Sequence, residues 1–103
     1  MKTKQFISDV LSAVADETEI DTKLILSQDK HRENVDARHI AIFLMFKYGV
    51  YAATIAEIFG ITPRNVQYIV SDFPTRLKQS TPMRKNYERI VLNVGKDFEN
   101  IAK

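Results

Sequence analysis

Polar side chains that can contact the edges of DNA bases gather in one short segment of the chain. The guanidinium of Arg64 suits O6 and N7 of guanine, and the amides of Asn65 and Gln67 suit adenine. Tyr68 suits a phosphate or the methyl group of thymine. Because the tip of a reading helix enters the major groove first, these groups need a helix that begins just before them. The candidate base contacts are Thr62, Arg64, Asn65, Gln67 and Tyr68.

Two short predicted helices joined by a sharp turn would position these side chains. Helical periodicity over residues 52–59 and 63–73 places Gly60 at the turn, and Thr62 and Pro63 are suited to cap and open the second helix. A helix-turn-helix also needs a small residue in its first helix, here Ala56, and apolar residues across the turn. Those apolar residues are Ile55, Phe59, Ile61, Val66 and Ile69. The pattern indicates a DNA-reading helix-turn-helix, with an ordinary corner between two helices as the alternative.

The second helix of this pair has an apolar side and a polar side. Val66, Ile69 and Val70 fall on the inner side. The outer side consists of Pro63, Arg64, Gln67, Tyr68 and Ser71, with Thr62 and Asn65 near the tip. The backbone N–H groups of residues 63–66 also suit a phosphate, because they lie at the positive end of the helix dipole. We expect Pro74 to end this helix, since a residue before proline avoids the helical region.

Two further groups of cations flank the pair of helices. Lys30, His31 and Arg32 lie in a polar, aperiodic stretch over residues 27–34, which we interpret as a loop leading into the helix that carries Arg38. Such a loop can enter a minor groove or follow a phosphate backbone. However, two carboxylates lie between these cations in the sequence, so a plain solvated loop is nearly as well supported. After the second helix come Arg76, Lys78, Arg84 and Lys85, which either contact phosphates or only keep the segment soluble. The candidate contacts to the DNA backbone or minor groove are Lys30, Arg32, Arg38, Ser71, Arg76 and Lys78.

Helical periodicity also governs the rest of the chain, and strand signals are nearly absent. Helices are expected at about residues 3–16, at about 20–26 with Asp21 or Thr22 as cap, and from about 35 to Gly49. Residues 40–46 are apolar almost all round, which is typical of a helix in the middle of a bundle. A last helix starts at Thr81 and Pro82; its apolar stripe consists of Met83, Tyr87, Ile90, Val91, Val94, Phe98 and Ile101, with Gly95 as a weak point. We predict a single all-α domain over residues 1–103, with about six helices around a buried central helix.

The composition excludes several classes of protein. A length of 103 residues suits one domain, and three glycines and three prolines are too few for a turn-rich β fold or a collagen. Without cysteine there is no disulfide framework, no thiolate zinc site and no cysteine nucleophile. No N-terminal run resembles a signal peptide, and the longest apolar stretch, residues 40–46, is too short to span a bilayer. We therefore expect a soluble, cytoplasmic protein that does not bind a membrane.

Charge is distributed unevenly along the chain. The net charge is only +2, but residues 1–29 carry −3, residues 30–60 carry +1 and residues 61–103 carry +4. The positive excess therefore lies around and beyond the predicted turn. Such asymmetry favours an anionic partner, and double-stranded DNA fits the residue types described above.

Two stretches follow the pattern of a known domain: HRENVDARHIAIFLMFKYG at residues 31–49 and TIAEIFGI at residues 54–61. The matching features are Arg32 in a basic loop, the helix over residues 37–44, and the pairs Ile55-Ala56 and Phe59-Gly60. On these residues the chain resembles the C-terminal DNA-binding domain of bacterial DnaA-type replication initiators, a Trp-repressor-like fold, over roughly residues 5–75. The resemblance implies that Arg32 reaches the minor groove and that the second helix reads the major groove. It also implies a bacterial or phage-encoded regulator of transcription or replication.

The chain departs from the pattern of that family at the turn. Residues 61–66 read ITPRNV, which is one residue shorter than the family's turn and lacks its Asp-His pair, so the base specificity of the family does not carry over. Tyr51 stands where the family has a capping serine. No Walker-type loop is present, and 103 residues leave no room for an ATPase domain. The resemblance therefore implies a stand-alone DNA-binding module with no nucleotide cofactor.

Two other classes of function were weighed against DNA binding. An enzyme is not expected, because the chain has no Ser/His/Asp set, no metal-spaced cluster and no phosphate loop, and His39 suits a core or capping role. No cofactor or metal is expected either. The second class is a protein-interaction module on the same scaffold with negligible DNA binding. In that case the C-terminal helix would support a homodimer or dock a partner, whereas its simplest role is packing over the bundle.

Overall fold

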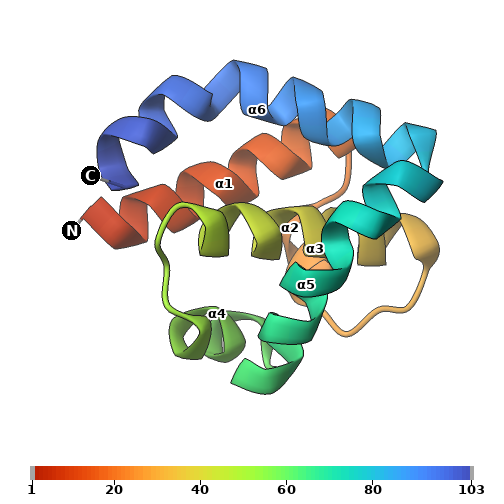
Figure 1. Cartoon of the computed structure of the whole chain (residues 1–103), viewed down its shortest axis with the longest axis horizontal. Helices are drawn as coiled ribbons and strands as arrows, with labels where there is room; N and C mark the ends of the chain where they lie inside the picture. Colours follow the sequence, from red (N-terminus) through yellow and green to blue (C-terminus); the bar gives the residue numbers. More distant parts are fainter. Residues whose placement is uncertain (1, 103) are drawn as a thin grey trace.

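Residues 2–102 form six helices in the computed structural model, which describes the side chains of residues 3–92. The helices are α1 (Lys2–Thr18), α2 (Thr22–Leu26), α3 (Arg32–Lys47), α4 (Ala52–Phe59), α5 (Pro63–Gln79) and α6 (Thr81–Ala102) (Figure 1). No strand occurs in this range, so the predicted all-α class is confirmed. Within the same range, no helix combines the length and the apolar character needed to cross a membrane.

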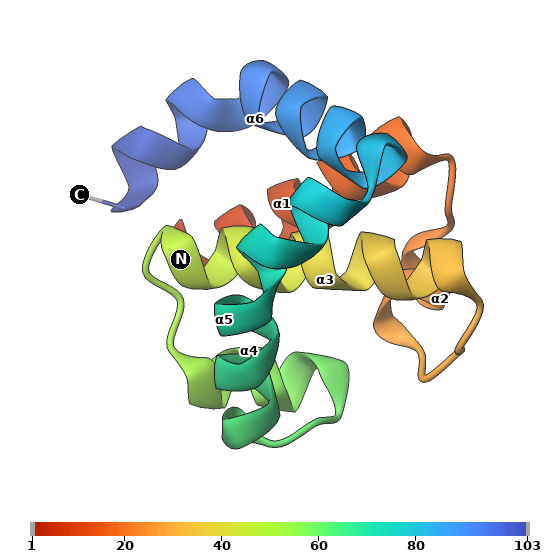
Figure 2. The ribbon, with the colours of Figure 1, turned by 45° about the vertical axis from the view of Figure 1, so that its right-hand side comes forward.

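Helix α3 runs through the middle of the molecule and contacts each of the other five helices. In Figure 2 it lies horizontally, with α5 crossing in front of it, α6 above and α4 below. Its buried residues cover slightly more than half of its circumference, and most residues on the remaining side are half-buried. The buried residues are Asn34, Ala37, Arg38, Ile40, Ala41, Ile42, Leu44 and Met45. The predicted buried central helix is therefore confirmed, and α3 forms the support on which the other elements are positioned.

Helices α1 and α6 lie side by side and together cover one side of α3 (Figure 1). Val14 of α1 is fully buried, and Met83 and Ile90 of α6 each expose at most 2% of their surface. At the surface, Nη1 of Arg89 donates to Oε1 of Glu17 at 3.3 Å. The described part of α6 thus packs over the bundle. The remaining members of its predicted stripe, and the predicted weak point, lie outside the described side chains: Val94, Phe98, Ile101 and Gly95.

One helix start differs from its predicted position. Helix α3 begins at Arg32, three residues earlier than expected, so the loop before it covers only residues 27–31. Helix α6 starts at Thr81, as predicted, and the hydroxyl of Ser80 just outside it accepts from the N–H of Met83 at 3.4 Å. Ser80 thus supplies an acceptor for the first turn of α6, whereas the side chain of His31 makes no such bond to α3.

Two predicted features of the helix ends are confirmed. The carboxylate of Asp21 caps α2 by accepting from the N–H of Lys23 at 2.8 Å. Gly49 follows the end of α3 with φ +104°, a conformation that favours glycine because it has no Cβ.

The prediction that Pro74 ends the second helix of the pair is wrong. Helix α5 continues through Pro74 to Gln79, although the proline removes the N–H that would bond to the carbonyl of Val70. Apolar packing on both sides of the proline offsets this loss, since Phe73 is buried and Leu77 packs against the core. Tertiary contacts therefore override the local preference.

An aromatic cluster holds the middle of α5 against α3 and α6. The rings of Phe73 and Phe43 stack with centroids 4.3 Å apart, and Tyr87 of α6 meets both rings edge-on, at 5.4 Å from Phe73 and 5.9 Å from Phe43. Offset stacking and edge-to-face contacts are the favoured geometries of aromatic pairs. The cluster fixes the C-terminal half of α5, and through it the direction in which the N-terminal half projects.

Candidate nucleic-acid interface

The turn between α4 and α5 is closed by backbone and side-chain hydrogen bonds. Gly60 has φ +67°, and its N–H and that of Ile61 both bond to the carbonyl of Ala56, the latter at 3.0 Å. This left-handed residue at the helix end is the conformation for which glycine is needed. Two residues later Thr62 caps α5, because its hydroxyl accepts from the N–H of Asn65 at 3.1 Å. The predicted turn residues therefore act as expected, in an arrangement compatible with a helix-turn-helix.

The two sides of α5 divide as predicted from its periodicity. Val66 and Ile69 are buried against α4, where Ile55, Ala56 and Phe59 are buried as well. The residues predicted to face outward are all exposed: Thr62, Pro63, Arg64, Asn65, Gln67, Tyr68 and Ser71. We call Arg64, Asn65, Gln67, Tyr68 and Ser71 the reading face.

The reading face is free of carboxylates. Between residues 63 and 71 the only charged side chain is that of Arg64, and the first turn of α5 contains no acidic residue. The positive end of the helix dipole lies at the same tip. The face thus has the electrostatic sign that suits an anionic polymer, and amide, phenol and hydroxyl groups that suit base edges. The hydroxyl of Thr62 serves as the cap, so this candidate base contact has a structural task as well.

The basic loop lies beside the turn. Gln28 donates through Nε2 to the carbonyl of Phe59 at 2.8 Å and, more weakly, to that of Gly60 at 3.4 Å. The loop over residues 27–31 and the turn before α5 are consequently neighbours, as Figure 2 shows. Lys30, one of the backbone candidates, is exposed in this loop. Arg32 is exposed too, but it lies in the first turn of α3 and lines a hollow with residues 79–82, at the far end of α5. The structure therefore brings the loop that carries Lys30, but not Arg32, to the start of α5.

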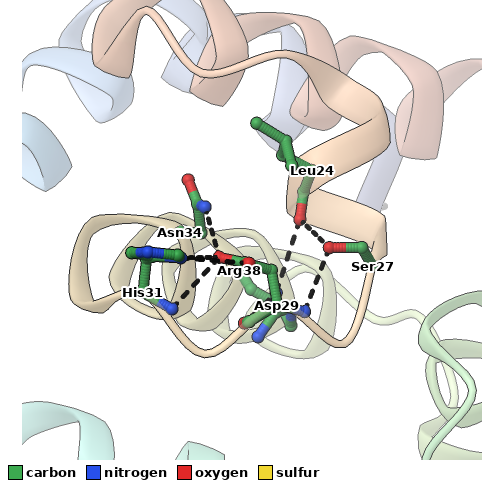
Figure 3. A network of polar contacts seen from close by, with 6 residues as sticks. All are labelled: Leu24, Ser27, Asp29, His31, Asn34 and Arg38. Atoms are coloured by element: carbon green, nitrogen blue, oxygen red, sulfur yellow. Dashed lines mark hydrogen bonds and ion pairs between the residues drawn. The ribbon is translucent and has the colours of Figure 1, made fainter.

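Arg38 was predicted to contact DNA, and the structure corrects that assignment. Its side chain is buried, with only 8% of the residue exposed, and the guanidinium donates to backbone carbonyls. Nε bonds to Ile25 O at 2.9 Å, and Nη2 bonds to Asp29 O at 3.0 Å and to Leu24 O at 3.4 Å (Figure 3). A guanidinium committed to three carbonyls in the interior is not available to a phosphate.

Arg76 is committed in a similar way. Its guanidinium forms an ion pair with Asp36 of α3 and donates to Nδ1 of His39, and both partners lie on the side of α3 that faces α5. Arg76 thus ties α5 to α3 instead of extending toward solvent, which corrects its assignment as a backbone contact. Lys78 is exposed, but it lies fourteen residues beyond Arg64, or about 21 Å along the helix.

No protein-family model and no curated protein matches this chain at a significant level. Among the described residues there is also no group of three or more His, Cys, Asp or Glu side chains that could hold a metal ion. The candidate site therefore consists of the reading face and the loop cations, and its function must be argued from their geometry.

Two residues of this region were missed by the sequence interpretation. Gln28 bonds to the end of α4, and the carboxylate of Asp29 accepts from the N–H of His31 at 3.0 Å and from the amide of Asn34 at 2.6 Å. The Asn34 amide is the largest cause of the lowered pKa of Asp29, followed by the two hydrogen bonds to His31. An aspartate two residues before a helix cap is a recognisable turn signal. The contact of Gln28 spans 31 residues and has no local signal.

Acid is expected to weaken the contact between α3 and α5 through His39. Burial, followed by the charges of Arg76 and Arg38, lowers the pKa of this imidazole from 6.5 to about 4. Between these two pKa values the unfolded chain therefore binds more protons than the folded protein. The contribution of neutral His39 to stability is complete above pH 6.5 and is lost as the pH falls toward 4. We expect the free energy of unfolding to decrease by roughly 2–3 kcal/mol over this range.

Urea unfolding of the wild type and of His39→Gln at pH 7 and pH 4.5 measures this effect. The glutamine keeps an acceptor for Arg76 but does not titrate. The free energy of unfolding of the variant is therefore expected to decrease clearly less between the two pH values than that of the wild type. Because Asp36 and Arg76 are present in both proteins, the difference isolates His39. Equal losses in the two proteins would show that His39 does not carry the pH dependence.

Proposed function

We propose that this chain is a sequence-specific protein for double-stranded DNA, with α4 and α5 acting as a helix-turn-helix. The observation that carries the proposal is the reading face, where Arg64, Gln67 and Tyr68 are exposed at the start of a helix whose opposite side is buried against its partner helix. A helix anchored on one side and polar at its tip can enter a major groove. The neighbouring loop cations supply contacts to the phosphate backbone or the minor groove.

The resemblance to the DnaA-type domain supports the same proposal from the sequence. It makes α5 the major-groove helix and Arg32 a minor-groove residue. Arg32 is exposed, as that role requires, although it lies near residues 79–82 and not beside the turn. The different residues at the turn imply a different target sequence. We therefore propose a regulator of replication or transcription whose DNA binding needs no nucleotide cofactor.

Selection from a random duplex library tests the proposal, and one motif is expected to be enriched. On that duplex, log K is expected to fall with log salt at a slope of roughly −3 to −4, because about four cations are available and each phosphate contact contributes about 0.9. Those cations are Lys30, Arg32, Arg64 and Lys78. An asymmetric motif would indicate a monomer, and a palindrome would indicate a dimer.

A double variant of the loop sharpens this measurement. Lys30→Ala with Arg32→Ala is expected to reduce the steepness of the salt slope by about 2, because two phosphate contacts are lost. Lys4→Ala removes an exposed cation of α1 and serves as the matched control, for which the slope is expected to stay unchanged. A flat salt dependence in the wild type, or the absence of any enriched motif, would contradict the proposal.

A protein-interaction module is the second candidate, and one surface favours it. Leu92 is 82% exposed, and it borders a shallow hollow together with Tyr87 and Val91. Exposed apolar side chains gathered in one place favour a protein partner. Self-association that is abolished by Leu92→Glu, together with negligible duplex binding, would favour this candidate over DNA binding.

A further inference from the structure

The loop over residues 27–31 is held by one buried guanidinium. Arg38 of α3 donates to Leu24 and Ile25 at the end of α2 and to Asp29 in the middle of the loop (Figure 3). Such a bridge needs the planar, branched donors of arginine, because lysine offers a single ammonium group. The path of the loop backbone therefore depends on a side chain that is itself shielded from solvent.

The loop side chains close the same segment from within. Ser27 Oγ accepts from the N–H of Asp29 at 3.1 Å and donates to Leu24 O at 2.7 Å. The Asp29 carboxylate in turn accepts from His31 N and from Asn34, which is buried in the first turn of α3. Figure 3 shows these groups arranged around Asp29, next to the guanidinium. A loop with this many internal bonds is ordered before any ligand arrives.

The ordered loop is also attached to the turn before α5. Gln28 makes the connection through the carbonyls of Phe59 and Gly60. A continuous run of contacts thus leads from Arg38 through the loop to the start of the reading face. Lys30, the exposed cation of this loop, lies two residues from Gln28. Ordering before binding raises affinity, because the entropy of the loop is not lost when the complex forms.

We propose that Arg38 is a positioning residue for DNA binding, which sets the loop so that Lys30 contacts the duplex together with the reading face, and which does not touch DNA itself. This inference rests on the proposed function. It assigns Arg38 a role different from the direct contact predicted from the sequence. A positioning role requires that the effect of Arg38 on affinity passes through Lys30.

A double-mutant cycle on the selected duplex tests this requirement. Arg38→Met is expected to lower the affinity about fivefold in the wild-type background and less than twofold in the Lys30→Ala background. Binding is measured at low temperature, where circular dichroism verifies that each variant is folded. If Arg38→Met lowers the affinity by the same factor in both backgrounds, Arg38 contacts DNA directly. If it lowers the affinity in neither background, the loop needs no positioning. Either result overturns the inference.

Two further measurements guard against a merely destabilised variant. Gln28→Ala leaves the core intact and is expected to lower the affinity about threefold, again only when Lys30 is present. Without DNA, trypsin is expected to cleave after Lys30 at least fivefold faster in folded Arg38→Met than in the wild type, and an unchanged rate overturns the inference. A wild type that binds no duplex overturns the proposed function and this inference together. If the wild type binds but Arg38→Met lowers the affinity by the same factor in both backgrounds, this inference alone is overturned.

Discussion

Replacing Arg64 and Gln67 together by alanine is expected to lower the affinity for the selected duplex by about 100-fold. Both side chains are exposed in the first two turns of α5, where a reading helix contacts base edges. A bidentate contact to one base is worth about 1–3 kcal/mol, so the loss of two contacts worth about 1.4 kcal/mol each, in the lower half of that range, lowers the affinity about 100-fold. Fluorescence anisotropy with the selected duplex and with a scrambled duplex measures the loss.

The scrambled duplex separates reading from general attraction. Affinity for it is expected to fall by much less, because Lys30 and Arg32 still attract the phosphates. The matched control is Thr75→Ala with Gln79→Ala, two exposed residues farther along the same helix, for which we expect no more than a twofold change. Equal losses on the two duplexes would show that Arg64 acts only as a charge and that α5 does not select a sequence.

Phe73→Ala is expected to have the largest effect on stability, a loss of about 3–5 kcal/mol in the free energy of unfolding. The Phe73 ring is almost completely buried and contacts Phe43 on α3 and Tyr87 on α6. Truncation removes two aromatic contacts and leaves a cavity where three helices meet. Urea unfolding followed by circular dichroism measures the change.

Two variants calibrate this result. Phe73→Leu fills most of the same space and is expected to cost clearly less than the alanine variant. Tyr68→Ala removes an aromatic ring from the exposed side of the same helix, where the residue is 66% exposed, so a change within about 0.5 kcal/mol is expected. A loss for Tyr68→Ala as large as that for Phe73→Ala would mean that the aromatic cluster is not what holds α5.

Local signals in the sequence were sufficient to predict α4 and the turn. Gly60, Thr62 and Pro63 each suit only a few backbone conformations, and the structure uses all three as predicted. The side of α5 that faces solvent was also predictable, because helical periodicity alone separates Val66 and Ile69 from Arg64 and Gln67.

Interactions between distant segments were not predictable in the same way. Because Arg38 follows a basic loop, the sequence pattern predicts an exposed cation. Its burial depends on carbonyls of residues 24–29, which approach the guanidinium only in the folded chain. Arg76 reads as part of a basic cluster, and its partners Asp36 and His39 lie 40 and 37 residues away. Pro74 was misjudged because its local cost is opposed by the packing of α5 on its neighbours. Which cations remain free for a ligand is thus a property of the tertiary structure.

The central place of α3 has a consequence for engineering this domain. The pair α4 and α5 occupies a continuous stretch of the chain, which makes it look suitable for transfer to another scaffold. However, α5 depends on α3 for Phe43, Asp36 and His39, and the loop beside the turn depends on α3 for Arg38. Grafting the pair alone would leave an apolar face uncovered and the loop without its anchor. The smallest portable unit that preserves this surface must therefore include α2 and α3 as well as α4 and α5.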